Sequence, residues 1–594
     1  MSSFDFGEDF GQKVDLTASI RNILRNYPEG TAILKELVQN ADDAGARTFS
    51  VCLDCRQHGT KMVADGALAQ FQGPALLAYN SGMFTDRDFQ SIQRIGDSLK
   101  KTADDQNKIG RFGIGFNAVY HLTDLPSFVS AGRLVMLDPQ ARFLPHVNPS
   151  NPGKMVDWIK HPEILEQVKD QFSPYHIRGE PIDWKKPLAG TVFRLPLRTP
   201  AQGTTSSLSK RALSVAEAAD LLDSLRVEAS AMLLFLKNVE TIEISYWAAD
   251  ARAPVTKFHC TIANMNPKLR SSRAFVGDMK RHTEVIHRNQ ALPVDFSLLV
   301  DCSENRGDGS APVLFQERWE VCNQLGGEVS NAIAGDEANE LLRLVPWGGV
   351  AACVHSTYPK EAVKCKSIQS GLAYCFLPLP VQTGLPVMVN GFFELSSNRR
   401  DVWQAGSDMT GDGQTRAQWN LALMRDIIAP SYVRLLMRLR EFLGFTDAYQ
   451  TIFPDSRVPA PWSNVVESCL TLCARQRLLE VISDTDRLQV LLGGDEYSSV
   501  QPNQKWPHDN WVTCMDSIVL PEDTTHELDV DQGFHKLCTL LVLTKSPVVL
   551  CRKDLNRTLT DKGVVKMVAK PPLVRSLLRK SAVRSKVQAD EGLK

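Results

Sequence analysis

Several features that mark particular protein classes are missing from this sequence. The formal net charge is only −1, which disfavours a nucleic-acid-coating surface, because such surfaces carry a strong basic excess. The chain has no apolar run of the roughly eighteen residues that a membrane-spanning helix needs. Its first ten residues, MSSFDFGEDF, are acidic, whereas targeting peptides are basic or apolar. We therefore expect a cytoplasmic protein with no membrane partner.

Metal and redox signatures are also scarce. The 13 cysteines are scattered, and the CxxC of Cys52 and Cys55 has no second pair to complete a zinc site or a disulfide framework. Cys469 and Cys473 are one helical turn apart and have no neighbouring histidine. We expect reduced thiols packed in the core. The GxxxxGK[ST] loop of P-loop NTPases and the HExxH motif of zinc proteases are both absent.

The most informative stretch that is present is Glu36 to Ala44, ELVQNADDA. A helix turns by about 100° per residue, which gathers apolar side chains on one side: Leu34, Leu37, Val38 and Ala41. Glu36, Asn40 and Asp43 then lie on the opposite side. Grouped oxygen ligands suit Mg²⁺, which binds through few protein groups together with substrate phosphates.

A glycine-rich stretch, GRFGIGF, occupies Gly110 to Phe116. Glycine adopts backbone angles that are closed to other residues, and it lets main-chain N–H groups approach an anion. The apolar residues between the glycines, Phe112, Ile114 and Phe116, can anchor such a loop. The stretch is therefore a candidate phosphate-binding loop.

Together, the two stretches resemble the GHKL superfamily of ATPases, which includes the Hsp ninety chaperones, gyrase, MutL and histidine kinases. The resemblance implies ATP and Mg²⁺ as cofactors, with Glu36 polarising the attacking water and Asn40 holding the metal. It also implies a set of nucleotide-binding residues: Asn40, Asp43, Ala44, Asn80, Gly110, Arg111, Phe112, Gly113, Ile114, Gly115, Phe116 and Thr191. The alternative is an ordinary amphipathic helix followed by a flexible turn.

The sequence departs from the superfamily at the adenine position. A DxGxG motif normally supplies an aspartate that accepts a hydrogen bond from the adenine amino group. Here we align Tyr79 with that aspartate, and Asn80 stands beside it at the turn Asn80-Ser81-Gly82. The amide oxygen of Asn80 could still accept a hydrogen bond. The polar segment 97–108 is expected to form a short lid or, alternatively, a solvated loop.

A narrower resemblance is to the sacsin repeat, whose repeats begin with a GHKL module in a very large cytosolic chaperone-like protein. It covers the opening VDLTASIRNILRNYPEGTAILKELVQNADDAGA, the segment GRFGIGFNAVYHLTDLPSFVS, and Phe376 to Trp403. In the superfamily, a basic residue of the second domain reaches the γ-phosphate. Arg399 or Arg400 is the catalytic candidate here, and surface ion pairs with acids such as Asp401 are the alternative.

We expect an α/β chain that opens with a GHKL (Bergerat) α/β sandwich, in which helices cover one face of a mixed sheet. The expected domains are 1–249 for ATP binding, 250–405 for a second α/β domain, and 406–594 for a mainly helical region. We expect helices at 14–27, 215–236 and 465–481, strands at 48–53, 125–137, 191–197, 241–247 and 540–550, a loop at 198–212, a turn at Asn390-Gly391, and a linker at 454–461.

The predicted function is that of an ATP-binding, slowly hydrolysing, chaperone-like module, whose nucleotide cycle changes its shape. Its expected partners are nucleotide and protein clients or co-chaperones, without nucleic acid. A histidine kinase is disfavoured because residues 1–30 contain no histidine. The alternative function is a non-hydrolysing scaffold that keeps the fold and binds nucleotide weakly or not at all.

Overall fold

The computed structural model describes residues 15–26, 29–93, 115–307, 309–358, 370–396, 401–404, 410–482, 511–519, 541–542, 546–565 and 567–568. The chain forms two compact units. Unit 1 comprises Met1–Ile262 with Cys302–Leu314, and unit 2 comprises Ala263–Asp301 with Phe315–Lys594. Among the described residues, no helix is both long and apolar enough to cross a membrane.

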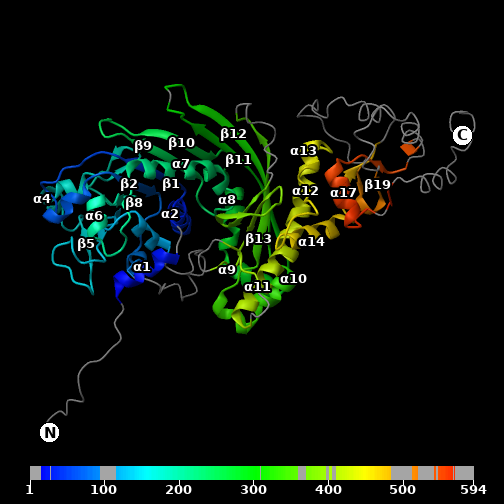
Figure 1. The fold of residues 1–594 in the computed structure, drawn as a ribbon, viewed down its shortest axis with the longest axis horizontal. Coiled ribbons are helices and arrows are strands. Elements are labelled where there is room, and N and C mark those ends of the chain that lie inside the picture. Colours follow the sequence, from blue (N-terminus) through cyan, green and yellow to red (C-terminus); the bar gives the residue numbers. More distant parts are fainter. Residues whose placement is uncertain are drawn as a thin grey trace, which may run out of the picture. The chain divides into compact units, whose positions relative to one another are not determined.

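Unit 1 contains a mixed sheet (Figure 1). Its strands follow the order β10 (Val255–Ile262), β9 (Thr241–Trp247), β1 (Thr48–Asp54), β2 (Ala75–Asn80), β8 (Leu188–Pro196), β3 (Ser127–Ala131), β4 (Arg133–Leu137) and β5 (Gly153–Asp157). Strand β1 pairs parallel with β9 and antiparallel with β2. The predicted α/β class and the strands expected at 48–53, 125–137, 191–197 and 241–247 are confirmed.

The predicted helices of unit 1 are present as α1 (Leu16–Asn26), α2 (Ala32–Asp43) and α7 (Val215–Met232). Helix α2 ends at Asp43, and Gly45 just beyond it adopts a positive φ of 73°. The Ala46 N–H donates to Ala41 O and the Gly45 N–H donates to Asp42 O, both at 3.0 Å. This pair of bonds is the Schellman motif, which satisfies the last helical carbonyls. The end of α7 lies four residues before the predicted position 236.

The other face of the sheet is covered by an irregular layer with short helices, α4 (Ile164–Gln167) and α5 (Lys169–Phe172). Cys52, Leu77 and Val192 point to this face and share a buried cluster with Trp158 and Phe172. Burial raises the pKa of the Cys52 thiol to about 12. Cys52 is therefore a structural core thiol, as expected.

The loop expected at 198–212 is interrupted by a helix, α6 (Pro200–Thr205). Thr199 and Gln202 form a capping box: the Gln202 N–H donates to Thr199 Oγ1 at 3.3 Å, and the Thr199 N–H donates to Gln202 Oε1 at 2.8 Å. Pro200 suits the first turn because its ring presets the helical φ. The prediction of a loop was therefore wrong at residues 200–205.

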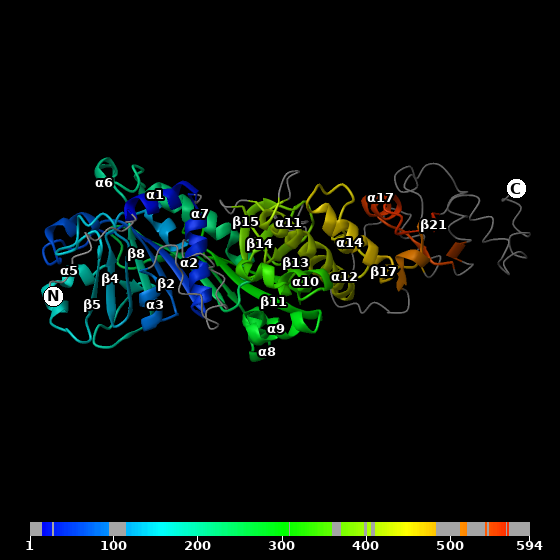
Figure 2. The same ribbon diagram turned by 90° about the horizontal axis from the view of Figure 1, so that it is seen from below.

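Unit 2 has its own strands, seen from a second direction in Figure 2. Their order is β15 (Leu377–Gln382), β14 (Leu372–Cys375), β16 (Met388–Gly391), β13 (Trp347–Ser356), β12 (Val313–Leu325) and β11 (Leu292–Glu304). The turn predicted at Asn390-Gly391 is wrong, because both residues lie in β16, where they pair with Gly349 and Gly348. The Phe376 N–H also donates to Asn390 Oδ1 at 2.9 Å, so tertiary pairing overrides the local turn preference.

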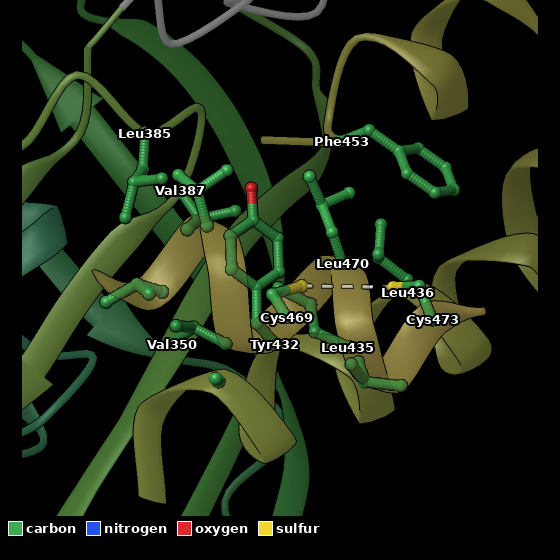
Figure 3. Packing of buried hydrophobic residues seen from close by; sticks show 14 of the residues in the cluster. Val350, Leu385, Val387, Tyr432, Leu435, Leu436, Phe453, Cys469, Leu470 and Cys473 are labelled. Atoms are coloured by element: carbon green, nitrogen blue, oxygen red, sulfur yellow. Dashed lines mark hydrogen bonds between the residues drawn. The ribbon is translucent and has the colours of Figure 1, made fainter. Parts of the chain in front are cut away.

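Helices pack on this sheet around a large buried cluster (Figure 3). They are α11 (Asp412–Ala422), the π-helical η7 (Leu423–Ile428), α12 (Ala429–Leu443) and α14 (Ser463–Cys473). In Figure 3, Tyr432 of α12 lies between Val350 of the sheet and Cys469 of α14. Cys469 and Cys473 are fully buried with their sulfurs 3.9 Å apart. The expectation of core thiols is confirmed here too.

The change from the π-helical turn η7 to the α-helix α12 is explained by Pro430. Pro430 has no N–H, so it cannot bond the carbonyl of Asp426 one turn earlier. That carbonyl instead accepts a hydrogen bond from Gln324 Nε2 at 2.9 Å. The adjacent π-helical turn thus falls where the α-helical ladder is broken.

Two further expectations for unit 2 need correction. The helix expected at 465–481 ends at Cys473 and is followed by β17 (Arg477–Glu480), which pairs with β18 (Trp511–Thr513). Segment 454–461 is irregular, but it is not an independent linker, because Val458 packs into the buried cluster. Within the predicted 540–550 stretch, β20 (Val548–Val549) is a strand.

Short elements complete the two units. They are η1 (Gly66–Phe71), α3 (Asp86–Ser91), η3 (Gly115–His121), β6 (His176–Ile177), β7 (Glu180–Pro181), α8 (Pro267–Ala274), η4 (Phe275–Gly277), α9 (Met279–His287), α10 (Glu328–Gly335), η5 (Glu337–Leu342), α13 (Asp447–Gln450), η10 (Cys514–Asp516), β19 (Ile518–Val519), α17 (Lys553–Asp561) and β21 (Met567–Val568).

Candidate functional site

Helix α2 carries the polar row that the sequence predicts. Glu36, Asn40 and Asp43 are each partly buried on one side of the helix. The opposite side is closed in the core by four side chains that are at most 2% exposed: Leu34, Leu37, Val38 and Ala41. The helical periodicity therefore placed both faces correctly, and the polar row is neither core nor open surface.

The Glu36 carboxylate lies directly against Gly115, the last glycine of the predicted phosphate loop. A Cβ atom at position 115 would lie 2.8 Å from Glu36 Cδ and closer still to Oε2. Such contacts are too short for a real side chain, so only glycine fits unless Glu36 moves. The first residue of the helix η3 and the proposed catalytic carboxylate are therefore neighbours.

Of the predicted phosphate loop, Gly115 and Phe116 are among the described residues. Gly110, Arg111, Phe112, Gly113 and Ile114 lie outside the described residues. The Phe116 ring packs 5.6 Å from the ring of Phe193, centroid to centroid. Phe116 is therefore an apolar anchor, as expected, and its side chain is committed to the sheet.

The turn after β2 rests on the C-terminal end of α2. Asn80 pairs with Thr191 across β2 and β8, and Asn80 Oδ1 accepts a hydrogen bond from the Gly82 N–H at 2.9 Å. A Cβ atom at Gly82 would lie 3.1 Å from Ala44 Cβ. The proposed residues Ala44, Asn80 and Thr191 are therefore brought together near the end of α2.

Strand register places Tyr79 and Asn80 on opposite faces of the sheet. Successive side chains of a strand point to opposite faces. Tyr79 lies against the buried cluster of the irregular layer, so its neighbour Asn80 points to the other face, together with Thr191. Asn80 therefore shares a face with Thr191, and Tyr79 does not.

Thr191 is engaged in holding this turn. Its hydroxyl donates to Gly82 O at 2.8 Å, and Ser130 Oγ lies 2.8 Å from Thr191 Oγ1. Ser130 Oγ in turn accepts the Phe84 N–H at 3.0 Å. Thr191 is fully buried, so its hydroxyl proton serves the protein backbone.

Asp43 is paired inside the protein. Lys237 Nζ lies 2.8 Å from Asp43 Oδ1, and both side chains are at most 7% exposed. Burial lowers the pKa of Lys237, but the carboxylates of Asp43 and Asp42 outweigh burial and raise that pKa. The charge of Asp43 is therefore balanced locally.

Asp42 is a structural residue that the sequence analysis missed. It is fully buried and accepts the backbone N–H groups of Lys237, Asn238 and Val239 at 3.1, 2.7 and 2.9 Å. It ties α2 to the segment that leads into β9. Asp42 lies one helical turn after Val38, on the apolar side of the helix, and an acidic residue at such a position indicates a buried partner.

Arg198 is a second missed residue, and it fixes η3. It is 1% exposed, and its guanidinium donates to Asp124 Oδ1 at 2.8 and 3.0 Å. It also donates to the carbonyls of Tyr120 at 2.6 Å and His121 at 2.9 Å. These bonds hold the end of the helix that begins at Gly115.

Asn40 fits a single-ligand role at magnesium. Within the described residues, its side chain makes no hydrogen bond, so its amide oxygen is available. Those residues also hold no group of three His, Cys, Asp or Glu side chains arranged for a metal. Mg²⁺ commonly keeps several waters and needs only one or two protein ligands beside phosphates. Arg399, Arg400 and the whole of the predicted lid (97–108) lie outside the described residues.

Comparison with known proteins identifies the family. The Sacsin domain model matches residues 13–259. Sacsin of Homo sapiens is 34% identical over an alignment of 446 residues that covers 73% of this chain. The chain is sacsin-like. It spans only 9% of the length of that relative.

A solved structure titled "Crystal Structure of N terminal domain of a DNA repair protein" also matches, at 12% identity. The match covers 53% of the sacsin-like chain and 74% of the chain in the solved structure. Its TM-score of 0.23 is too low to carry an argument. The family assignment therefore depends on the sequence matches.

Proposed function

We propose that unit 1 of this sacsin-like chain binds a magnesium–nucleoside triphosphate and hydrolyses it slowly, in the manner of GHKL ATPases. The observation that carries the proposal is the contact between the Glu36 carboxylate and Gly115. Two separate motifs meet at that point, and an amphipathic helix with an unrelated flexible turn gives no reason for them to meet.

Each residue would have a defined task. Glu36 would orient the attacking water, and Asn40 would hold Mg²⁺, which supplies charge neutralisation to the phosphates. The backbone N–H groups from Gly110 to Gly115 would bind the phosphates. Arg399 or Arg400 would add positive charge at the γ-phosphate. In this class of reaction, positioning and electrostatics supply most of the catalysis.

The biological setting is part of the same proposal. By the resemblance to sacsin repeats, the nucleotide cycle would change the shape of a cytoplasmic, chaperone-like module that acts on protein clients or with co-chaperones. The second candidate is a scaffold with weak or absent nucleotide binding. It is favoured by the engagement of Thr191 and Asp43 within the protein.

Magnesium-dependent binding of a nucleoside triphosphate distinguishes the proposed ATPase module from the scaffold. Calorimetry of the full chain with nucleoside triphosphate, with and without Mg²⁺, should show tighter binding when the metal is present. In Asn40→Ala, the Mg²⁺-dependent gain should disappear while the metal-free affinity persists. That metal-free titration is the internal control. A chain that binds no triphosphate at millimolar concentration is a scaffold.

A further inference from the structure

The orientation of the Asn80 side-chain amide is fixed by its neighbours. The Gly82 N–H lies 2.9 Å from one end of that amide, and a backbone donor requires an acceptor. The oxygen must therefore face Gly82, which places the NH₂ group at the other end. Asn80 is only 6% exposed, so this orientation is held in a buried environment.

The NH₂ group of Asn80 is uncommitted. Among the described residues, Asn80 Nδ2 makes no hydrogen bond, although the residue is more than nine-tenths buried. Nδ2 is not fully enclosed by the protein, so it is open to an acceptor that a ligand supplies. The face on which Asn80 lies is that of Thr191 and the α2 end.

Asparagine and aspartate present opposite chemistry at this position. With one oxygen bound to the Gly82 N–H, an aspartate would still offer a second oxygen, which accepts a hydrogen bond from an amino group. Asn80 offers an N–H donor in its place. Adenine carries an amino donor at C6, whereas guanine and hypoxanthine carry an oxygen acceptor there. The uncommitted donor therefore matches an oxygen at C6.

The neighbouring acids are engaged within the protein. The Asp42 oxygens accept backbone N–H groups of 237–239, and Asp43 pairs with Lys237. The Thr191 hydroxyl already donates its proton to Gly82 O. Within the described residues, the Asn80 NH₂ group is thus a donor without a protein acceptor.

We propose that the base position of this chain prefers a 6-oxopurine, guanine or hypoxanthine, over adenine. This inference rests on the proposed nucleotide-binding function and specifies its substrate. The recognition step is a hydrogen bond from Asn80 Nδ2 to the oxygen at C6, and the Asn80–Gly82 bond holds the donor in place.

Competition among three nucleotides tests the inference. Calorimetry of the full chain should show Mg·GTP and Mg·ITP binding about tenfold or more tightly than Mg·ATP. ITP lacks the guanine amino group, so its agreement with GTP assigns the preference to the oxygen at C6. Asn80→Asp keeps an acceptor for the Gly82 N–H, and it should reverse the order in favour of ATP.

A matched control is available at Asn148. Its Oδ1 also accepts two backbone N–H groups of a turn, from Ser150 and Asn151 at 2.9 Å, and it is exposed and distant in sequence from the site. Asn148→Asp should leave the order GTP, ITP, ATP unchanged. Equal or tighter binding of Mg·ATP by the wild-type chain, or an unchanged order in Asn80→Asp, overturns the base preference alone. Absence of binding by all three nucleotides overturns the nucleotide-binding function as well.

Discussion

Gly115 and Glu36 are packed so closely that no other residue fits at position 115 without movement. A Cβ atom there would lie 2.8 Å from Glu36 Cδ. Glu36 belongs to α2 and Gly115 begins η3, so this contact joins the two motifs on which the functional proposal depends. The position of the carboxylate is thereby linked to the end of the predicted phosphate loop.

The first prediction concerns this contact. Gly115→Ala should displace the Glu36 carboxylate or the loop and should reduce nucleotide turnover at least about tenfold, because misplacement of a catalytic group by about 1 Å is costly. Phosphate release measures the effect. Gly66→Ala is the control, because its added Cβ meets nothing within 4 Å, and its turnover should match the wild type. Full turnover in Gly115→Ala would argue against the proposed role of Glu36.

The second prediction concerns the buried pair of Arg198 and Asp124. Arg198→Met should lower the free energy of unfolding of unit 1 by about 3–5 kcal/mol, because it leaves Asp124 charged and buried without its partner. Denaturant titration followed by circular dichroism measures the loss. Arg142→Met removes an exposed arginine with a single bond to Thr205 O, and it should change stability by less than about 1 kcal/mol. Similar effects of the two substitutions would show that the pair is not structural.

The third prediction concerns pH. Burial lowers the pKa of His282 from 6.5 to about 4, and Asp278 opposes this shift only in part. Between these two pH values, the unfolded chain binds a proton that the folded chain does not. The stability of unit 2 should therefore fall as pH falls from 6.5 to 4, with a contribution from His282 of about 3 kcal/mol.

His282→Leu tests this contribution. It should flatten the dependence of the unfolding free energy on pH over that interval, as measured by denaturant titration at several pH values. His287→Leu, on the exposed side of the same helix α9, should retain the wild-type slope. Parallel slopes in both variants would contradict the lowered pKa.

The sequence predicted the local elements of unit 1 because their signals are local. Helical periodicity separated Leu37 from Glu36. The resemblance also named both members of the Glu36–Gly115 contact, although not their distance. The sequence near Asp42 could not predict its hydrogen-bond partners, because the three N–H groups that it binds belong to residues 237–239.

Strand register is a feature that local signals do not determine. A shift of one residue turns a side chain to the opposite face of a sheet, so the faces of Tyr79 and Asn80 follow from the pairing of β2 with β8. A similar limit explains Asn390-Gly391, a good turn sequence that the pairing with Gly349 and Gly348 holds in a strand. Both outcomes depend on contacts with strands that are distant in sequence.

The central claim is that Glu36 acts on a bound nucleotide. The most direct test is phosphate release from Mg·GTP and Mg·ATP by the full chain and by Glu36→Ala, with binding followed by calorimetry on the same samples. The account predicts that both proteins bind nucleotide, while turnover is lost only in Glu36→Ala. Unchanged turnover in that variant, or no binding by the wild-type chain, would contradict it.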